Sequence, residues 1–180
     1  SFVFKVDGEG VVLWKHRLAP PSPQECSSAS APRIRATADS GVVLAYRTAC
    51  AGSHARIVRF DGAGNLLWQH DDGGTAVPTD IVATIDGGAF VALSGGVVLR
   101  LDADGRLRWR RALGDGEEAV ELSAAAEFCS AAAAGAMCDV VVGGSRATDP
   151  GARPTGYVAR LSTPTGATLA ARVVAAADAA

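Results

Sequence analysis

The side chains that could carry chemistry in this 180-residue sequence are four cysteines, three histidines and several groups of aspartate, glutamate and arginine. The number of cysteines is even, and they stand at Cys26, Cys50, Cys129 and Cys138. The sequence has no Cys-x-x-Cys pair, and the cysteine spacings match no familiar zinc site. Cys129 and Cys138 flank a short alanine- and glycine-rich loop, which a hairpin would bring within bonding range. We therefore predict the disulfides Cys26–Cys50 and Cys129–Cys138, and with them an oxidising compartment.

The histidines His16, His54 and His70 are candidates for acid–base catalysis, which needs a nucleophile or a carboxylate beside the imidazole. His16 and His70 each follow a tryptophan by two residues, so they occupy equivalent positions. Equivalent positions favour a shared surface role over a unique active site. We expect no catalytic residue among them.

Three short turns, at 7–10, 61–64 and 102–105, begin with aspartate and end with glycine, as the opening of a calcium loop does. A calcium loop needs six to eight oxygen ligands, including a late bidentate glutamate. Counting from Asp102, the twelfth position is Leu113, which cannot bind a metal. We therefore favour ordinary turn chemistry, in which the aspartate bonds its own backbone, and expect no cofactor, with calcium as the alternative.

A basic cluster contains Arg106, Arg108 and Arg110. Regular strand alternation would place these three arginines on one face of a strand, with Leu107 and Trp109 on the other. Arginines on an outer strand protect a free sheet edge from unwanted pairing. The alternative is a partner surface for an anionic polysaccharide or an acidic protein.

The overall composition excludes several classes of protein. Seventeen basic and nineteen acidic residues leave a net charge of -2, which does not suit a nucleic-acid-binding domain. The apolar runs are shorter than the ~18 residues of a membrane-spanning helix, so we expect no membrane span. Because residue 1 is Ser rather than Met, we expect either a removed signal peptide or a piece of a longer chain.

An internal repeat positions these residues. Segments 4–14, 58–68 and 99–109 share the pattern apolar-basic-apolar-Asp-x-x-Gly-x-x-x-Trp, and 158–169 is a weaker copy with Ser for Asp and no Trp. A second motif, Ala-Thr-x-Asp-x-Gly-x-x-x-Ala, occupies 36–45 and 83–92. A stretched third copy spans 120–144 and contains the second cysteine pair.

Each motif predicts a β-hairpin, because apolar and polar residues alternate before an Asp/Gly turn and a second Val-, Leu- and Trp-rich strand follows. Two hairpins in each period of roughly 40–60 residues make the four-stranded antiparallel blade of an all-β propeller. The expected strands are 3–6, 11–17, 33–38, 42–49, 55–60, 66–70, 80–85, 89–94, 97–102, 107–112, 119–126, 139–145, 157–162 and 168–174.

The strands divide into about three and a half blades within one propeller segment, 1–180. Residues 1–17 form an outer half-blade, and the blades are 33–70, 80–112 and 119–174. A closed propeller usually has four to eight blades. We therefore expect the rest of the disc in a longer chain or in the second copy of a homodimer.

The repeat resembles the seven-bladed β-propeller repeat of secreted bacterial proteins. It is similar, more distantly, to the blades of quinoprotein (PQQ-type) propellers, and Thr165-Gly166 is nearest to that form. In the quinoprotein propellers the equivalent tryptophan docks one blade onto the next. The resemblance therefore implies a structural, inter-blade role for Trp14, Trp68 and Trp109.

The fold alone does not define a function, because propellers host binding, scaffolding and catalysis. We predict a bacterial binding or scaffold module without catalysis of its own, which is secreted, periplasmic or at the cell surface. Its protein or polysaccharide partner would bind the loops at one face of the disc, such as 18–32, 71–79 and 146–156. The alternative is a quinoprotein-type propeller enzyme or an outer-membrane assembly component.

Overall fold

The computed structural model describes residues 2–18, 31–48, 54–114, 119–129, 138–148 and 153–174, and these residues form strands and turns without a helix. No described segment is therefore a helix long and apolar enough to cross a membrane. The fourteen strands are β1 (Phe2–Val6), β2 (Val12–Arg17), β3 (Arg33–Ala36), β4 (Val42–Arg47), β5 (Ala55–Phe60), β6 (Leu66–Asp72), β7 (Pro78–Ala83), β8 (Ala89–Leu93), β9 (Val97–Leu101), β10 (Leu107–Ala112), β11 (Ala119–Cys129), β12 (Cys138–Ala147), β13 (Thr155–Ser162) and β14 (Thr168–Val174).

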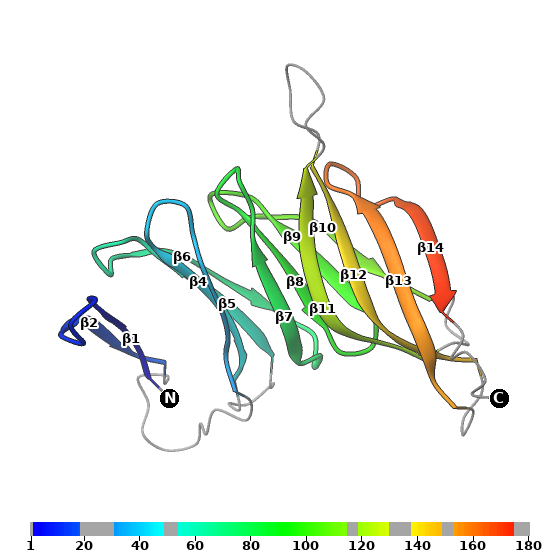
Figure 1. Ribbon diagram of the computed structural model, residues 1–180, viewed down its shortest axis with the longest axis horizontal. Helices are drawn as coiled ribbons and strands as arrows, with labels where there is room; N and C mark the ends of the chain where they lie inside the picture. Colours follow the sequence, from blue (N-terminus) through cyan, green and yellow to red (C-terminus); the bar gives the residue numbers. More distant parts are fainter. Residues whose placement is uncertain are drawn as a thin grey trace.

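The strands form one two-stranded and three four-stranded antiparallel sheets, each in chain order. We call β1–β2 the half-blade, β3–β6 blade 1, β7–β10 blade 2 and β11–β14 blade 3. Figure 1 shows them side by side in a row, with the two ends of the chain at opposite ends. The predicted fold, an all-β propeller segment of four-stranded antiparallel blades, is confirmed.

Apolar side chains fill the space between neighbouring blades. In β8, Ala89, Val91 and Leu93 belong to the core that blade 2 shares with blade 1, whereas Phe90 and Ala92 belong to the core shared with blade 3. All five are fully buried. A strand buried on both faces is apolar throughout, which explains why β8 lacks the alternation of a half-exposed strand.

The same β-bulge recurs in the outer hairpin of the half-blade and of each blade. The pairing register shifts by one residue near the start of β2, β6, β10 and β14. One extra residue therefore stands immediately before each tryptophan or its equivalent: Leu13, Leu67, Arg108 and Leu169. A bulge moves every later side chain of the strand to the opposite face from the one that strict alternation predicts.

The bulge corrects one prediction about the arginine cluster. Leu107 pairs with Leu101 and Trp109 pairs with Arg100, so Arg108 has no partner of its own in the ladder. Arg106, Arg108 and Arg110 therefore do not form a regular row on one strand face. The prediction of one shared face is wrong because it assumed an unbroken period of two.

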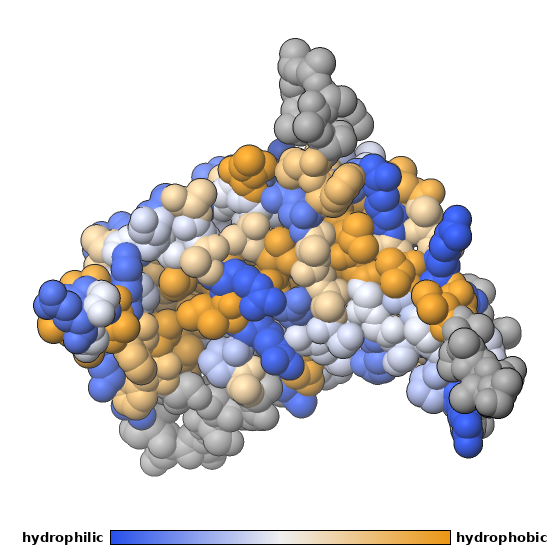
Figure 2. Space-filling view, viewed as in Figure 1, coloured by the Kyte–Doolittle hydropathy of each residue, from blue (hydrophilic) through white to orange (hydrophobic). Residues whose placement is uncertain are grey.

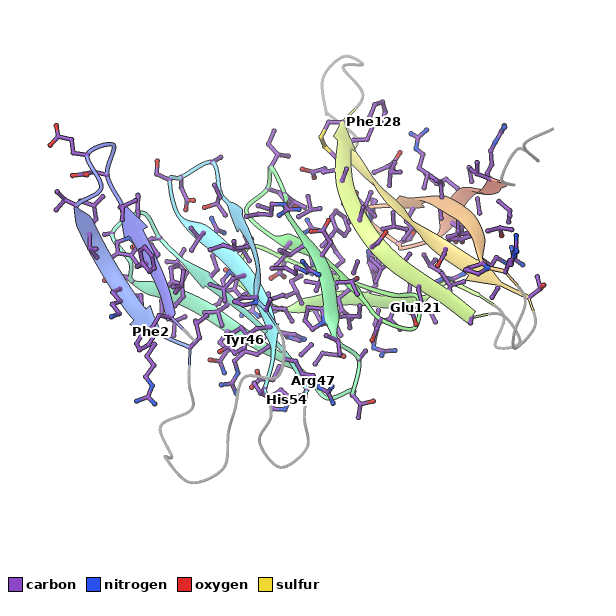
Figure 3. The ribbon with its side chains drawn as sticks, turned by 60° about the horizontal axis from the view of Figure 1, so that its bottom comes forward. Phe2, Tyr46, Arg47, His54, Glu121 and Phe128 are labelled. Carbon is purple, nitrogen blue, oxygen red and sulfur yellow. A yellow bond between two sulfur atoms is a disulfide. The ribbon has the colours of Figure 1, made fainter. Side chains whose placement is uncertain are left out.

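The first hairpin of blade 3 is longer than predicted. β11 runs to Cys129 and β12 starts at Cys138, where the expected strands were 119–126 and 139–145. The disulfide Cys129–Cys138 joins the two strand ends, as predicted. Cys26 and Cys50 lie outside the described residues. Figure 3 shows Phe128 at the tip of this hairpin, beside the disulfide.

Both ends of the row expose apolar side chains. Phe2 and Phe4 of the half-blade are 55% and 58% exposed, and Val158 and Val174 on the outward face of blade 3 are 42% and 57% exposed. Figure 2 shows hydrophobic surface at both ends of the row as well as between the blades. The outward faces of the half-blade and of blade 3 thus resemble the buried faces of the inner blades.

Candidate functional site

The three predicted tryptophans lie at the blade junctions. Each indole ring contacts the glycine that closes the Asp-x-x-Gly turn, or its longer equivalent, in the next blade: Trp14 on Gly64, Trp68 on Gly105 and Trp109 on Gly166. Gly105 has a φ of 77°, and a Cβ added to it would lie 2.6 Å from a ring carbon of Trp68. The glycine is therefore needed both for the turn conformation and for the close approach of the ring.

Two of the indole N–H groups also bond the next blade. Trp14 Nε1 donates to the carbonyl of Gly62 at 3.2 Å, and Trp109 Nε1 donates to the carbonyl of Thr163 at 2.7 Å. Trp68 Nε1 is buried and has no hydrogen-bond partner in the described part of the chain. Packing against Gly105 is therefore the main contact that Trp68 offers the next blade.

His16 lies inside a junction as well. Its ring stacks on Phe60 with centroids 4.5 Å apart, and its Nε2 is 2.6 Å from the carbonyl oxygen of Gly64. His70 pairs with Ile57 within blade 1 and is half-buried. His16 is half-buried like His70, and its contacts with Phe60 and Gly64 give it a junction role that the expected surface role did not include.

The aspartates of the outer turns bond their own backbone. Asp61 Oδ1 accepts from the N–H groups of Ala63 and Asn65 at 2.9 and 2.8 Å. Asp102 Oδ1 accepts in the same way from Asp104 and Arg106, at 3.0 and 2.9 Å. These are the predicted turn bonds, and they occupy one oxygen of each carboxylate.

In each of the three four-stranded blades, the basic residue of the outer motif pairs with an acid of the inner hairpin. The pairs are Arg59–Asp39, Arg100–Asp86 and Arg160–Asp139. In the first pair the two charged groups are 2.9 Å apart. The hydroxyl of Thr37 and the charge of Arg59 hold the pKa of Asp39 below its usual value.

In the first two junctions the motif cation also crosses to the next blade. Lys5 Nζ donates to the carbonyls of Ser40 and Gly62 at 3.0 and 3.1 Å, and Arg59 donates to the carbonyl of Gly87. These bonds bridge the half-blade to blade 1, and blade 1 to blade 2. The motif cation is thus a second inter-blade contact beside the tryptophan.

The third junction differs, because the hydrogen bonds of Arg100 to described residues all lie within blade 2. Arg100 is almost completely buried, and its guanidinium bonds Asp86, the hydroxyl of Thr84 at 3.1 Å and the carbonyl of Leu101. From blade 3, Glu127 accepts the N–H of Ile85 at 3.0 Å. Burial raises the pKa of Glu127, and the nearby charge of Asp86 raises it further.

Sequence reasoning missed Asp80, which joins three blades. Its Oδ1 accepts from Arg35 Nη2 of β3 at 2.7 Å and from Ile81 N at 2.9 Å, and its Oδ2 accepts from Ala125 N of β11 at 2.9 Å. The carboxylate is 9% exposed, so its bonds replace lost hydration. A lone acid in the otherwise uncharged strand 78–83 is the signal that could have identified it.

The three predicted arginines have separate acidic neighbours. Arg106 lies 3.4 Å from Asp104 at an exposed turn, and Arg110 lies 3.5 Å from the buried Asp72 of blade 1. Arg108 lies 3.6 Å from Asp102. The three cations therefore face three different carboxylates.

A cleft of about 470 Å³ opens between blades 2 and 3 on the side of the hairpin turns. Its lining residues come from β9, β10 and three turns: Asp86, Arg100, Asp102, Arg108, Thr163 and Pro164. Of the three arginines predicted as a partner surface, Arg108 alone lines it. The cleft lies at the junction where the motif cation makes no hydrogen bond to a described residue of the next blade.

Of the loops predicted to contact a partner, 71–79 is described, whereas 19–30 and 149–152 lie outside the described residues. Asp71 accepts from Arg56 Nε and Nη2 at 2.6 and 2.9 Å, and His54 Nε2 lies 3.5 Å away. Burial acts to raise the pKa of Asp71, but the bonds to Arg56 outweigh it and lower the pKa. Figure 3 shows His54 beside Tyr46 and Arg47, at the end of blade 1 away from Phe128.

Four-stranded antiparallel sheets that pack face to face, with a tryptophan at each junction, define a β-propeller. The sequence profile of the family described as outer membrane protein assembly factor BamB matches residues 8–136. The chain belongs to this family of PQQ-type propeller repeats. No curated protein matches the sequence.

Solved structures share the fold. BamB from Moraxella catarrhalis superposes with a TM-score of 0.59 at 16% identity, over 95% of this chain and 43% of that one. A protein of unknown function from Bacteroides caccae superposes with a TM-score of 0.56 at 15% identity, over 95% of this chain and 53% of that one. BBS1N, solved in complex with ARL6DN, superposes with a TM-score of 0.59 at 13% identity, over 96% of this chain and 47% of that one. The chain thus spans about half the length of these structures.

Proposed function

We propose that this chain is part of a propeller that binds and holds other proteins in the bacterial cell envelope, without catalysis of its own, and that it serves outer membrane protein assembly. The observation that carries the proposal is the match of residues 8–136 to the BamB family. A structural neighbour of the same fold, BBS1N, was solved with a second protein bound. Protein binding is a common use of the propeller fold.

The junction contacts support a scaffold. Trp68 on Gly105, Arg59 on Gly87 and Asp80 with Arg35 tie neighbouring blades together through bonds and packing. A unit held in this way presents its turns in fixed positions. Fixed positions lower the entropic cost of binding a partner.

The periplasm is the compartment that we propose. The Cys129–Cys138 disulfide suits an oxidising compartment, and the family is described as an assembly factor for outer membrane proteins, which supports a location in the envelope. The repeat also resembles the seven-bladed propeller repeat of secreted bacterial proteins, and we include that resemblance in the proposal of an exported protein.

We also propose that further blades cover the exposed ends, either in a longer chain or in a second copy. Phe2 and Phe4 at one end and Val158 and Val174 at the other would otherwise leave apolar blade faces in water. Light scattering on the isolated chain tests this proposal. A well-folded, monodisperse monomer of 18.2 kDa would contradict it.

The test of function is a comparison of cross-linked partners in the native bacterium. The tagged chain is expressed in the periplasm, cross-linked in living cells, and its partners are quantified by mass spectrometry against a tagged periplasmic protein of similar size. We expect components of outer membrane protein assembly to be enriched, and outer membrane protein levels to fall when the gene is deleted. Unchanged levels together with no enriched protein would refute the proposal.

A further inference from the structure

Arg108 departs from the repeat at the bulge of the outer hairpin. The equivalent residues are Leu13, Leu67 and Leu169, so an apolar side chain occupies this position in three of the four copies. Leucine is thus compatible with the local backbone, and the bulge itself does not require arginine. The side chain of Arg108 is 66% exposed and lines the cleft between blades 2 and 3.

The cleft is open because both neighbouring hairpins of blade 3 differ from the repeat. Its outer turn, 162–166, has one residue more than the turn 102–105, and that turn supplies Thr163 and Pro164 to the wall. Its inner hairpin continues to Cys129 in place of the short Thr-x-Asp-x-Gly turn. The carbonyl that Arg59 reaches at the previous junction therefore has no counterpart for Arg100 among the described residues.

The acids of the cleft are already engaged. Asp86 accepts from the hydroxyl of Thr84 at 2.6 Å, from Gly88 N at 3.2 Å and from Arg100. Asp102 accepts two backbone N–H groups with Oδ1. The remaining oxygen of Asp102, Oδ2, lies 3.6 Å from Arg108.

Among the described residues, the hydrogen-bond donors of the cleft that remain without an acceptor belong to Arg108 and Thr163. The guanidinium of Arg108 has the ion pair with Asp102 at 3.6 Å and makes no hydrogen bond with any described residue. The hydroxyl oxygen of Thr163 is buried and has no hydrogen-bond partner in the part of the chain that the structure describes. A group that accepts hydrogen bonds and carries negative charge would satisfy both side chains.

We propose that this cleft binds one carboxylate side chain, Asp or Glu, of a partner polypeptide through Arg108 and Thr163. The planar fork of a guanidinium matches the two oxygens of a carboxylate. The charges of Asp86 and Asp102 oppose an incoming anion, but Arg100 neutralises the first, and the second already lies beside Arg108. The inference rests on the proposed protein-binding function and names the chemistry of the partner.

A polypeptide fits better than an anionic polysaccharide. A repeating polyanion needs a row of free cations to bind tightly. Arg106 and Arg110 lie beside Asp104 and Asp72, away from the cleft, and Glu127 adds a negative charge near its inner end. The two arginines and two aspartates of the cleft balance in charge, so a ligand is held by the N–H groups of Arg108 and not by an excess of positive charge. This arrangement suits a single carboxylate better than a polyanion.

Binding of small probes to the full chain tests the proposal. The labelled chain is titrated by NMR with acetyl-Gly-Glu-Gly-amide, with the Gln and Lys versions of that peptide, and with trigalacturonic acid. We expect the glutamate peptide to bind best and to shift the signals of Gly105 and Gly166. The glutamine peptide should bind at least about tenfold more weakly, because it lacks the charge.

Substitutions identify the side chains that bind. Arg108→Leu installs the residue of the other copies, so it should fold normally and weaken binding of the glutamate peptide at least about tenfold. Thr163→Val should weaken binding of the glutamate peptide about threefold or more, because valine has nearly the shape of threonine but lacks the hydroxyl group. Arg106→Gln, on the same hairpin but outside the cleft, is the matched control and should change affinity less than about twofold.

Several results would overturn the inference. They are absence of binding by every probe, preference for the lysine peptide or for trigalacturonic acid, and normal binding by a folded Arg108→Leu chain. The same variant in the cellular cross-linking experiment separates the two proposals. If it retains all partners of the wild type, the cleft inference fails and the scaffold function stands. If the wild type binds the glutamate peptide but captures no protein, the function fails.

Discussion

The indole ring of Trp68 in blade 1 lies directly on Gly105 in blade 2, with no room for a Cβ between them. The contact joins two residues that stand at fixed places in two copies of one motif. It recurs at each junction between described blades, so it is the structural unit that the repeat encodes. The contribution of this contact to the free energy of unfolding can be measured by substituting either Trp68 or Gly105.

Truncation of the ring is the first measurement. Trp68→Ala should lower the free energy of unfolding by about 3–5 kcal/mol, because it removes a large, 92%-buried aromatic side chain from the core between blades 1 and 2. Urea denaturation would give the value. If the stability hardly changes but partner binding is lost, the ring is a ligand platform and the packing role is wrong.

Filling the space beneath the ring is the second measurement. Gly105→Ala should destabilise the chain by about 1–3 kcal/mol, because the methyl group meets Trp68 and because the φ of 77° strains an alanine. Gly10→Ala is the matched control, since Gly10 also has a positive φ, 85°, and a Cβ at that position meets no atom within 4 Å. It should cost about 1 kcal/mol through backbone strain alone. Equal effects of the two substitutions would refute the docking role of Gly105.

The carboxylate of Asp80 offers a separate test of how the blades are joined. Asp80→Asn should cost about 1–3 kcal/mol, because it removes the charge that faces Arg35 and one of the oxygens that accept hydrogen bonds. Asp104→Asn removes a fully exposed ion pair and should cost less than about 0.5 kcal/mol. Thermal unfolding of both variants distinguishes a buried bridge from a surface pair.

Acidification should destabilise the blades. The pKa values of Asp39, Asp71 and Asp86 are lowered in the folded chain, so these groups bind protons more readily when unfolded. Their contribution to stability is complete above the unfolded value of about 3.9 and is lost as the pH falls through the lower folded values. We measure the urea concentration at the unfolding midpoint from pH 7 to pH 2. This midpoint concentration should decrease once the pH is lower than about 4.

Glu127 should behave in the opposite way, because its pKa is raised in the folded chain. Its contribution is present below the unfolded value and is lost as the pH rises through the folded value. Glu127→Gln should therefore raise the urea midpoint at pH 7 relative to the wild type and leave it unchanged near pH 3. A loss of stability at pH 7 would show that the bond to Ile85 outweighs the burial of the charge.

The disulfide of blade 3 closes a loop with a sequence separation of nine residues. Replacing both Cys129 and Cys138 by serine should lower the free energy of unfolding by about 2–3 kcal/mol, by the chain-entropy account. Non-reducing peptide mapping of the wild type should recover this pair together with the predicted Cys26–Cys50 pair. Free thiols at all four positions would contradict the proposed compartment.

The repeat and its spacing in the sequence determine the strand order, the blades and the positions of the tryptophans. Alternation ending in an Asp/Gly turn defines a hairpin locally, and copies such as 58–68 and 99–109 must occupy equivalent places, so the blades and the tryptophan positions could be predicted. The Cys129–Cys138 bond was predictable for the same local reason, since a hairpin brings its two ends together.

Tertiary structure alone decided what the side chains at the junctions do. The bulge before Trp109 turned Arg108 out of the predicted arginine row, and the extended hairpin of blade 3 left a cleft for it to line. Asp80 finds Arg35 and Ala125 on strands some 45 residues away in each direction. Such contacts depend on the packing of whole blades, and local propensity carries no information about which distant strand faces a given side chain.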